Sequence, residues 1–192
     1  MSKGKASKFV EDSARICYRS VSTDLKTPDD FVRMLIKRGH EAMIEHVVVT
    51  VDFVCDRGVT HEIVRHRLAS YAQESTRFIN YTKDGVVEKA GIRVIRPPCK
   101  CKEADKEWLK AMKNAEKSYF KMILLGEAPQ IARSVLPNST ASRIRVTMNM
   151  HAWRNFFRLR TAAAAHPQMQ EVAKKVLAVF RKQYTAFVED IQ

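Results

Sequence analysis

A short stretch of strict alternation constrains the fold more than any other feature of this chain. In residues 142–149 the apolar side chains of Ile144, Val146 and Met148 are interleaved with polar ones. Successive side chains of a strand point to opposite faces, so the pattern predicts a half-buried strand with a basic polar face. The β-branched run at residues 47–55 predicts a second strand.

Helical signals fill much of the remaining chain. Thr27 can cap a helix that begins at Pro28 and stops at Gly39. After a turn at residues 56–58, a short helix is expected to open at Thr60 and to run into the arginine-rich segment that follows. Further helices are expected at residues 103–125, 129–135, 151–160 and 167–188, and residues 80–102 are expected to be irregular.

The pattern of elements predicts one α+β domain. No internal repeat, low-complexity tract or convincing linker interrupts the chain, and its length suits a single domain over residues 1–192. Few strands among many helices predict helices that enclose a small mixed sheet.

The chain is strongly basic, with 34 Lys and Arg against 21 Asp and Glu and a net charge of +13. Such a charge favours polyanionic partners. Five lysines recur every three or four residues and form one stripe of a helix, which is best interpreted as a solvated face. These are Lys106, Lys110, Lys113, Lys117 and Lys121. The arginines gather instead at residues 65–77 and 133–160, which predicts discrete anion pockets.

Composition also narrows the cellular setting. No apolar run approaches the ~18 residues that a membrane span needs, and residues 1–8 do not resemble a secretory signal. Four cysteines in a chain of this size do not predict a disulfide framework. We therefore expect a cytoplasmic protein with reduced thiols and no membrane partner.

The densest group of polar and charged side chains begins at Arg65-His66-Arg67 and continues, after seven residues, with Ser75 and Arg77. The planar fork of an arginine binds phosphate or carboxylate, and a nearby serine hydroxyl can donate to the same group. The segment could also be a solvated helix end. Its interleaved donors and acceptors favour a site for a polar, planar, anionic ligand.

This segment resembles the signature of the flavin-dependent thymidylate synthases. Gly39-His40-Glu41, followed by Glu45-His46, is similar to that family's flavin-contacting segment. Residues 132–137 are similar to its Ala-Arg-x-x-Leu-Pro element, and Leu159-Arg160 to part of its C-terminal nucleotide segment.

The resemblance implies a reaction and its participants. Members methylate dUMP at C5 to give dTMP, with methylenetetrahydrofolate as carbon donor and NADPH as reductant. The hydride passes through FAD, so no enzymic nucleophile is required. The family is homotetrameric, with active sites shared between subunits.

The resemblance also implies site residues. Ser75, Arg77 and Arg133 would hold the nucleotide phosphate, and Arg160 would hold the uracil ring. Ser75 and Arg160 are the predicted catalytic residues. The full set predicted to bind dUMP is Glu62, Gln73, Glu74, Ser75, Arg77, Arg133 and Arg160. The set predicted to bind FAD is His40, Glu45, Arg65, His66, Arg67, Asn149 and Asn155.

Three positions depart from the family's usual residues. The pair Ala72-Gln73 replaces Asn-Glu, so position 73 keeps an acceptor but loses a charge, and no acid–base role is expected there. Phe78 replaces the usual tyrosine and removes a hydroxyl.

Other chemistries fit less well. His61 and His66 are five residues apart, which at ~100° per residue places them about 140° apart on a helix, so no zinc site is predicted. Cys99 and Cys101 lack further metal ligands, and a likeness of Pro98-Cys99 to the cysteine-dependent thymidylate synthases is interpreted as coincidence. The alternative of another class is a small basic nucleic-acid-binding protein, although the chain has no recognisable nucleic-acid-binding module.

Overall fold

The computed structural model describes residues 4–19, 27–82 and 91–192, which fall into two compact units. Unit 1 comprises Met1–Val51, His66–Tyr71 and Val146–Gln192, and unit 2 comprises Asp52–Arg65 and Ala72–Arg145. The chain passes repeatedly from one unit to the other. A single domain over residues 1–192 stays a prediction.

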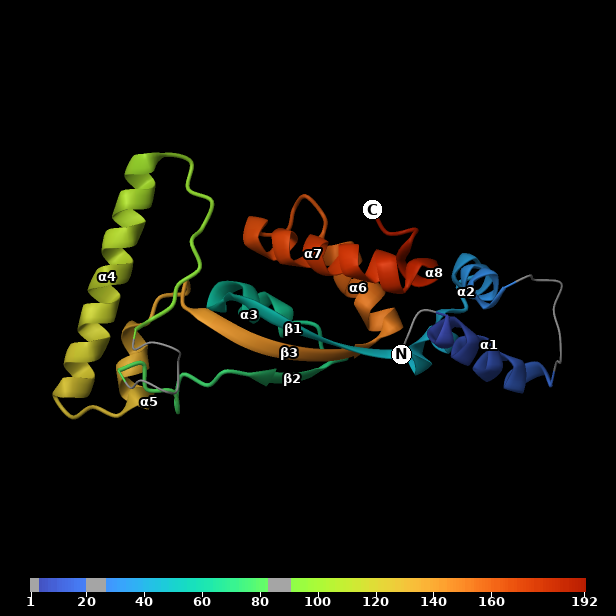
Figure 1. Cartoon of the computed structure of the whole chain (residues 1–192), viewed down its shortest axis with the longest axis horizontal. Helices are drawn as coiled ribbons and strands as arrows, with labels where there is room; N and C mark the ends of the chain where they lie inside the picture. Colours follow the sequence, from blue (N-terminus) through green and yellow to red (C-terminus); the bar gives the residue numbers. More distant parts are fainter. Residues whose placement is uncertain (1–3, 20–26, 83–90) are drawn as a thin grey trace. The chain divides into compact units, whose positions relative to one another are not determined.

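Each unit has its own helices (Figure 1). Those of unit 1 are α1 (Lys5–Tyr18), α2 (Pro28–Lys37), the 3₁₀-helix η1 (Glu41–His46), α6 (Met150–Arg160), α7 (Pro167–Gln183) and α8 (Thr185–Val188). Those of unit 2 are α3 (Arg57–Ile63), α4 (Lys102–Leu124), α5 (Pro129–Ala132) and the 3₁₀-helix η2 (Arg133–Val135).

One three-stranded sheet joins β1 (Val48–Asp56), β3 (Ala141–Asn149) and β2 (Ser70–Gln73) in that order. The α+β class with a small sheet is confirmed, but the strands are antiparallel, whereas a mixed sheet was expected. β2 has only four residues, too few for a recognisable pattern, so its direction could not be predicted from the sequence.

The predicted alternation of β3 is confirmed. Ile144 and Val146 are fully buried and Met148 is 2% exposed, whereas Arg143 and Arg145 are exposed. The two arginines lie opposite Asp52 of β1, which accepts from Arg145 Nε at 2.7 Å and from Arg143 Nη2 at 2.5 Å. One face of β3 therefore supplies the core, and the other presents charge.

The structure corrects two helix boundaries. Asp56 Oδ1 accepts from Val59 N–H at 2.9 Å and caps α3, so that helix begins at Arg57, not at Thr60, and ends at Ile63, before the arginine-rich segment. The helix expected at residues 167–188 is interrupted at Tyr184, whose φ of −134° is not helical. Helix α1 was not predicted, and part of the expected irregular segment, residues 83–90, lies outside the described residues.

The core of unit 1 is aromatic. Trp153, Phe156 and Phe157 of α6 have no exposed surface, and the ring of Phe157 lies 5.0 Å from that of Phe180 in α7. Trp153 Nε1 donates to Val49 O at 3.0 Å, so its only polar atom is satisfied. These rings are core residues and not a platform for base stacking.

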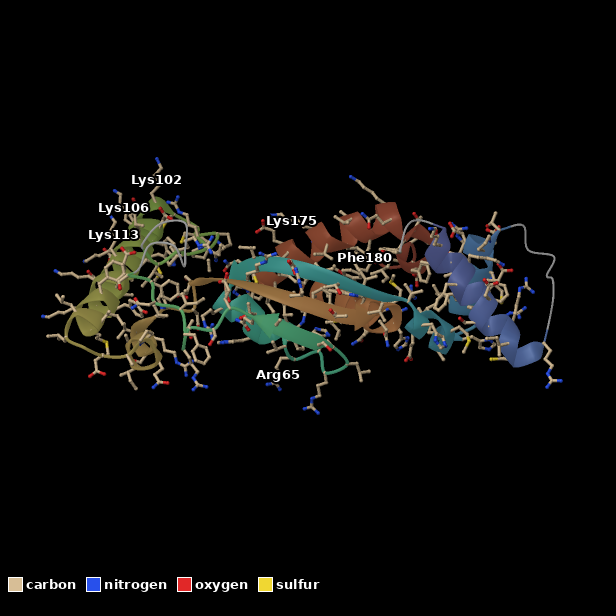
Figure 2. All side chains as sticks on the ribbon, turned by 60° about the horizontal axis from the view of Figure 1, so that its bottom comes forward. Arg65, Lys102, Lys106, Lys113, Lys175 and Phe180 are labelled. Atoms are coloured by element: carbon tan, nitrogen blue, oxygen red, sulfur yellow. The ribbon has the colours of Figure 1, made fainter. Side chains whose placement is uncertain are left out.

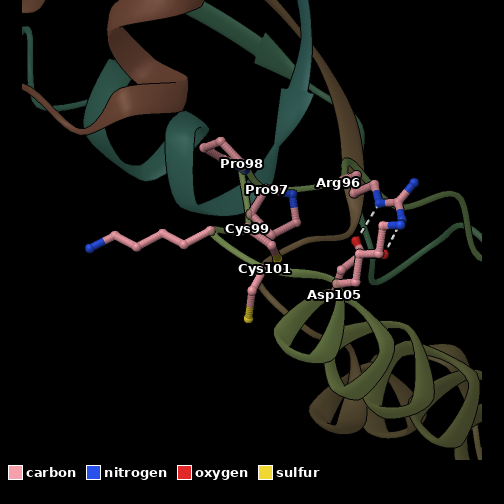
Figure 3. A pocket seen from close by; sticks show the side chains of 8 residues that line it. Arg96, Pro97, Pro98, Cys99, Cys101 and Asp105 are labelled. Carbon is pink, nitrogen blue, oxygen red and sulfur yellow. Dashed lines mark hydrogen bonds and ion pairs between the residues drawn. The ribbon is translucent and has the colours of Figure 1, made fainter.

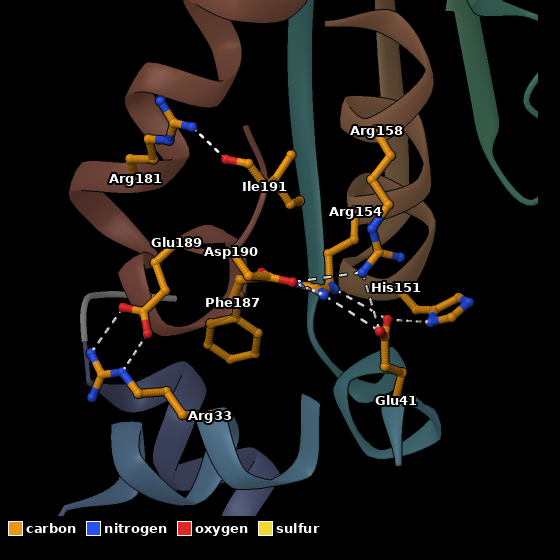
Figure 4. Close-up of polar contacts among 10 residues, drawn as sticks. All are labelled: Arg33, Glu41, His151, Arg154, Arg158, Arg181, Phe187, Glu189, Asp190 and Ile191. Atoms are coloured by element: carbon orange, nitrogen blue, oxygen red, sulfur yellow. Dashed lines mark hydrogen bonds and ion pairs between the residues drawn. The ribbon is translucent and has the colours of Figure 1, made fainter. Parts of the chain in front are cut away.

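A buried arginine ties the C-terminal segment to α6 (Figure 4). Arg154 is 0% exposed. Its Nη1 donates to Asp190 Oδ1 at 2.6 Å and to Phe187 O at 2.5 Å. Its Nε donates to Glu41 Oε2 at 3.1 Å. Burial alone would raise the pKa of Glu41, but its hydrogen bond and charge interaction with Arg154 outweigh burial and lower that pKa. Arg154 therefore has a structural role.

His66 is half-buried and packs against this core. Its ring lies 5.0 Å from that of Phe156, and its Nε2 accepts from Arg160 Nε at 3.0 Å. Burial, and then the charge of Arg160, lowers the pKa of His66 to about 4 from its ordinary 6.5. The imidazole is therefore neutral at pH 7.

Unit 2 packs around α4. Tyr119 is fully buried against Tyr81 and Ala132, and the predicted lysine stripe is exposed. Figure 2 shows Lys106 and Lys113 extending from this helix. No helix within residues 4–19, 27–82 and 91–192 combines the length and apolar character required to cross a membrane.

Replacing Arg154 with Met should lower the free energy of unfolding by about 3 kcal/mol, because it strands the Glu41 and Asp190 carboxylates. Urea denaturation at pH 7 measures the change. Arg158→Met is the matched control: Arg158 contacts the same carboxylates, but 48% of its side chain is exposed, so less than about 1 kcal/mol should be lost. Equal losses in the two variants would contradict a structural role specific to Arg154.

Acidification should destabilise the protein through His66. Between pH 6.5 and about 4 the unfolded chain binds a proton at His66 that the folded chain excludes, so stability is lost as pH falls through this window. His66→Asn should lose less stability between pH 7 and pH 5 than the unsubstituted protein, as followed by thermal denaturation. His61→Asn, which replaces an exposed ring, should match the unsubstituted protein. An unchanged pH dependence in His66→Asn would reject this assignment.

Candidate active site

The first part of the Arg65-to-Arg77 motif, Arg65-His66-Arg67, contains two exposed arginines. Arg65 follows the end of α3, and Arg67 precedes β2. Both side chains are exposed, and neither guanidinium has a hydrogen-bonding or ionic partner within the residues that the structure describes. Arg65 belongs to unit 2 and Arg67 to unit 1. Exposed, unpaired guanidinium groups can bind an anionic ligand.

The second part of the motif lies in a turn after β2. Ser75 Oγ accepts from the backbone N–H of Arg77 at 3.3 Å, and Ser75 O accepts from Ile79 N–H at 3.0 Å. Arg133 at the start of η2 reaches this turn, because its Nη1 donates to Thr76 Oγ1 at 3.5 Å. Three residues of the predicted phosphate site therefore lie at one turn of unit 2.

Charge favours an anion at this turn. The Arg77 guanidinium lies over the ring of Phe78, 5.5 Å from its centroid, and forms no ion pair within the described part of the chain. Arg133 likewise forms no ion pair with any described residue. A serine hydroxyl and two arginines without a carboxylate partner form a donor set suited to a phosphate monoester.

Gln73 and Glu74 border a neighbouring open hollow of about 370 Å³, which is also lined by Ala72, Arg143 and Arg145. Gln73 Nε2 donates to two buried hydroxyls, Thr60 Oγ1 at 3.0 Å and Ser142 Oγ at 3.2 Å. These two hydrogen bonds therefore hold the amide nitrogen of Gln73 in place.

The predicted FAD residues of unit 1 are only partly brought together. Asn149 Nδ2 donates to Glu45 Oε2 at 3.4 Å, while Asn149 Oδ1 caps α6 by accepting from Ala152 N–H at 2.8 Å. The cap confirms the helix start expected near residue 151. His40 and Asn155 are exposed, and no described side-chain contact joins them to Glu45 or Asn149.

Two predicted ligand residues contact each other. His66 was expected to bind FAD and Arg160 to bind dUMP, and both lie in unit 1, where they form the hydrogen bond described above. Because His66 is neutral at pH 7, it adds no cation to the site. Its contacts with Arg160 and Phe156 position the arginine. Glu62 lies near the end of α3 and is half-buried.

Three residues around the predicted nucleotide site were not predicted from the sequence: Asp52, Thr60 and Ser142. Asp52 accepts from both Arg143 and Arg145, and these contacts lower its pKa, Arg145 contributing most. Its place in the alternating pattern of β1 was a usable signal. Thr60 and Ser142 carried no signal, because only the fold brings them to Gln73.

A second open hollow, of about 460 Å³, holds the cysteine pair (Figure 3). Cys101 Sγ accepts from Ala104 N–H at 3.5 Å and caps α4, and Arg96 pairs with Asp105 beside it. Across residues 4–19, 27–82 and 91–192, no three His, Cys, Asp or Glu side chains gather closely enough to hold a metal ion.

The sequence model of a known family, described as thymidylate synthase complementing protein, matches residues 2–184. Several relatives carry the name flavin-dependent thymidylate synthase. The one from Clostridium tetani is 31% identical, over 91% of this chain and 78% of that protein. The one from Corynebacterium diphtheriae is also 31% identical, over 96% of this chain and 78% of that protein.

A third relative of the same name, from Pyrococcus abyssi, is 38% identical over 75% of this chain, which spans 59% of that protein's length. The family match includes both motif segments and continues well beyond them into α7. The resemblance drawn from the Arg65-to-Arg77 motif is thereby confirmed, and the chain belongs to the thymidylate synthase complementing protein family, that of the flavin-dependent thymidylate synthases.

Proposed function

We propose that this protein is a flavin-dependent thymidylate synthase that converts dUMP to dTMP. Methylenetetrahydrofolate supplies the carbon and NADPH the reducing equivalents. The observation that carries the proposal is the family match over residues 2–184, within which the complete Arg65-to-Arg77 motif lies. When bound, FAD supplies hydride chemistry that no side chain can provide.

The donor set suits FAD. The cofactor carries an anionic pyrophosphate, and Arg65 and Arg67 are exposed cations without a described partner. Their charge would also favour the anionic reduced form of the ring. His40, Glu45, His66, Asn149 and Asn155 complete the proposed flavin surroundings, with His66 acting through Arg160 and Phe156.

The nucleotide would bind mainly to unit 2. Ser75, Arg77 and Arg133 hold its phosphate at the turn after β2. Glu62, Gln73 and Glu74 contact the base or sugar. Arg160 stabilises negative charge that develops on the uracil oxygens, because a planar cation can donate to two of them.

We also propose a homotetramer with shared active sites in the cytoplasm. Large apolar side chains are exposed on the single chain close to the motif: Leu68 is 76% exposed and Phe78 is 79% exposed. Burial of such side chains in an assembly would remove apolar surface from water. The alternative of a nucleic-acid-binding protein is not favoured, because the family match accounts for the motif.

Tritium release from [5-³H]dUMP tests the activity directly, since methylation at C5 expels the hydrogen there. Purified protein with FAD, NADPH and methylenetetrahydrofolate should release tritium and form dTMP, and omission of FAD should abolish both. Protein that binds FAD and dUMP but releases no tritium with all substrates present would refute the proposal.

Arg133→Ala should weaken dUMP binding by roughly 10- to 100-fold, because a charge-assisted hydrogen bond contributes about 1.5–3 kcal/mol. Affinity for FAD should be unchanged. Calorimetric titration of each ligand measures the two effects separately. Arg96→Ala is the control: Arg96 is a unit 2 arginine paired with Asp105, so neither affinity should change. An equal loss of both affinities in Arg133→Ala would argue against the phosphate role.

A further inference from the structure

The orientation of the Gln73 amide follows from the single proton of a neighbouring hydroxyl. Thr60 Oγ1 donates its proton to Arg57 O at 2.9 Å. A threonine hydroxyl has one proton, so toward Gln73, 3.0 Å away, Thr60 can only accept. The Gln73 atom facing Thr60 must therefore be the amide nitrogen. The contacts of the amide, and not its nearly symmetric shape, assign which end is the nitrogen.

Ser142 occupies the second amide proton. Gln73 Nε2 lies 3.2 Å from Ser142 Oγ, and the primary amide has two N–H groups, one for each hydroxyl. Thr60 has no exposed surface and Ser142 is 3% exposed. Two buried acceptors, contributed by α3 and β3, therefore hold the donor end of the Gln73 side chain.

The acceptor end of the same side chain is open. Gln73 Oε1 has no partner within the described residues, and it is not among the buried polar atoms that lack one. It is therefore accessible to solvent. Gln73 also lines the hollow that is bordered by Glu74, Arg143 and Arg145. Both of these arginines pair with Asp52. The side chain thus combines a fixed donor end with a free acceptor.

We propose that Thr60 and Ser142 are positioning residues that make Gln73 Oε1 a hydrogen-bond acceptor for an N–H or O–H donor of the nucleotide. This inference rests on the proposed function and refines it. The nucleotide has two donors of this kind, the imide N–H of the base and the 3′-hydroxyl of the sugar. A carboxylate at position 73 could not make the same hydrogen bond to Thr60, because it has no proton to donate and the Thr60 hydroxyl can only accept there.

The two hydroxyls beside position 73 account for a departure from the family pattern. Glutamate is usual at position 73, and the loss of its charge predicts only that no acid–base role remains there. In this chain the surrounding hydroxyls match an amide, so Gln73 is part of a complementary group with Thr60 and Ser142. Thr60 acts only through Gln73 and is not a catalytic residue.

The test compares Thr60→Val with Thr140→Val, a matched control. Both threonines are fully buried, and each donates its hydroxyl proton to a carbonyl three residues earlier, Thr140 to Pro137 O at 2.6 Å. Thr140 makes no described contact with Gln73. Calorimetry on FAD-loaded protein gives the dissociation constants of dUMP, N3-methyl-dUMP and 3′-deoxy-dUMP.

One analogue should bind the unsubstituted protein and Thr140→Val roughly three- to tenfold more weakly than dUMP, the value of one neutral hydrogen bond. Which analogue loses affinity identifies the donor. Thr60→Val should show a smaller affinity difference between dUMP and that analogue, because the Gln73 amide is then free to turn. Thr60→Ser keeps the hydroxyl and should restore the affinity difference. If Thr60→Val still binds dUMP and the weaker analogue with the same affinity ratio as Thr140→Val, the proposal is overturned.

Gln73→Met keeps the inference testable if Thr60→Val does not fold. It removes the acceptor at similar volume and should abolish the discrimination between dUMP and the same analogue. Full discrimination in Gln73→Met would overturn the proposal. A chain that binds FAD but no dUMP would count instead against the proposed function, so the two failures are distinguishable.

Discussion

Strand β3 pairs with both other strands of the sheet, and most of the described structure depends on that pairing. Its inward residues enter the core, and its outward arginines Arg143 and Arg145 both pair with Asp52 of β1. At its end, Asn149 caps α6 and starts the helix that supplies the aromatic core of unit 1. Because the strand alternates so regularly, a register slip of one residue would bury Arg143 and Arg145.

The distribution of carboxylates separates structural arginines from those available to ligands. Asp52 pairs with Arg143 and Arg145, and Glu41 and Asp190 pair with Arg154. In the described part of the chain, no carboxylate pairs with the arginines of the motif and of the proposed phosphate site, which are Arg65, Arg67, Arg77 and Arg133. A net charge of +13 therefore does not mean one uniform basic surface. Of the 34 Lys and Arg side chains, some pair with carboxylates, some form the lysine face of α4, and some have no carboxylate partner at the motif.

Local signals predicted the regular elements well. The Thr27 cap and Pro28 set the start of α2, and the alternation of residues 142–149 gave β3 to within one residue. The predicted start of α3 at Thr60 was wrong, because Asp56 was interpreted as a turn residue although it caps the helix. Strand β2 was missed because four residues carry no period, and its hydrogen bonds to β3 are made across a long stretch of sequence.

For the site, the sequence by itself determined the motif, the family and the residue types able to bind a phosphate. Those depend on side-chain chemistry and spacing, which are local. Only the tertiary structure decided that Arg133 reaches the turn after β2, that His66 is a neutral, half-buried residue beside Arg160, and that Thr60 and Ser142 fix Gln73. These contacts join residues far apart in the chain, and burial and hydrogen-bond geometry arise only when the chain has folded.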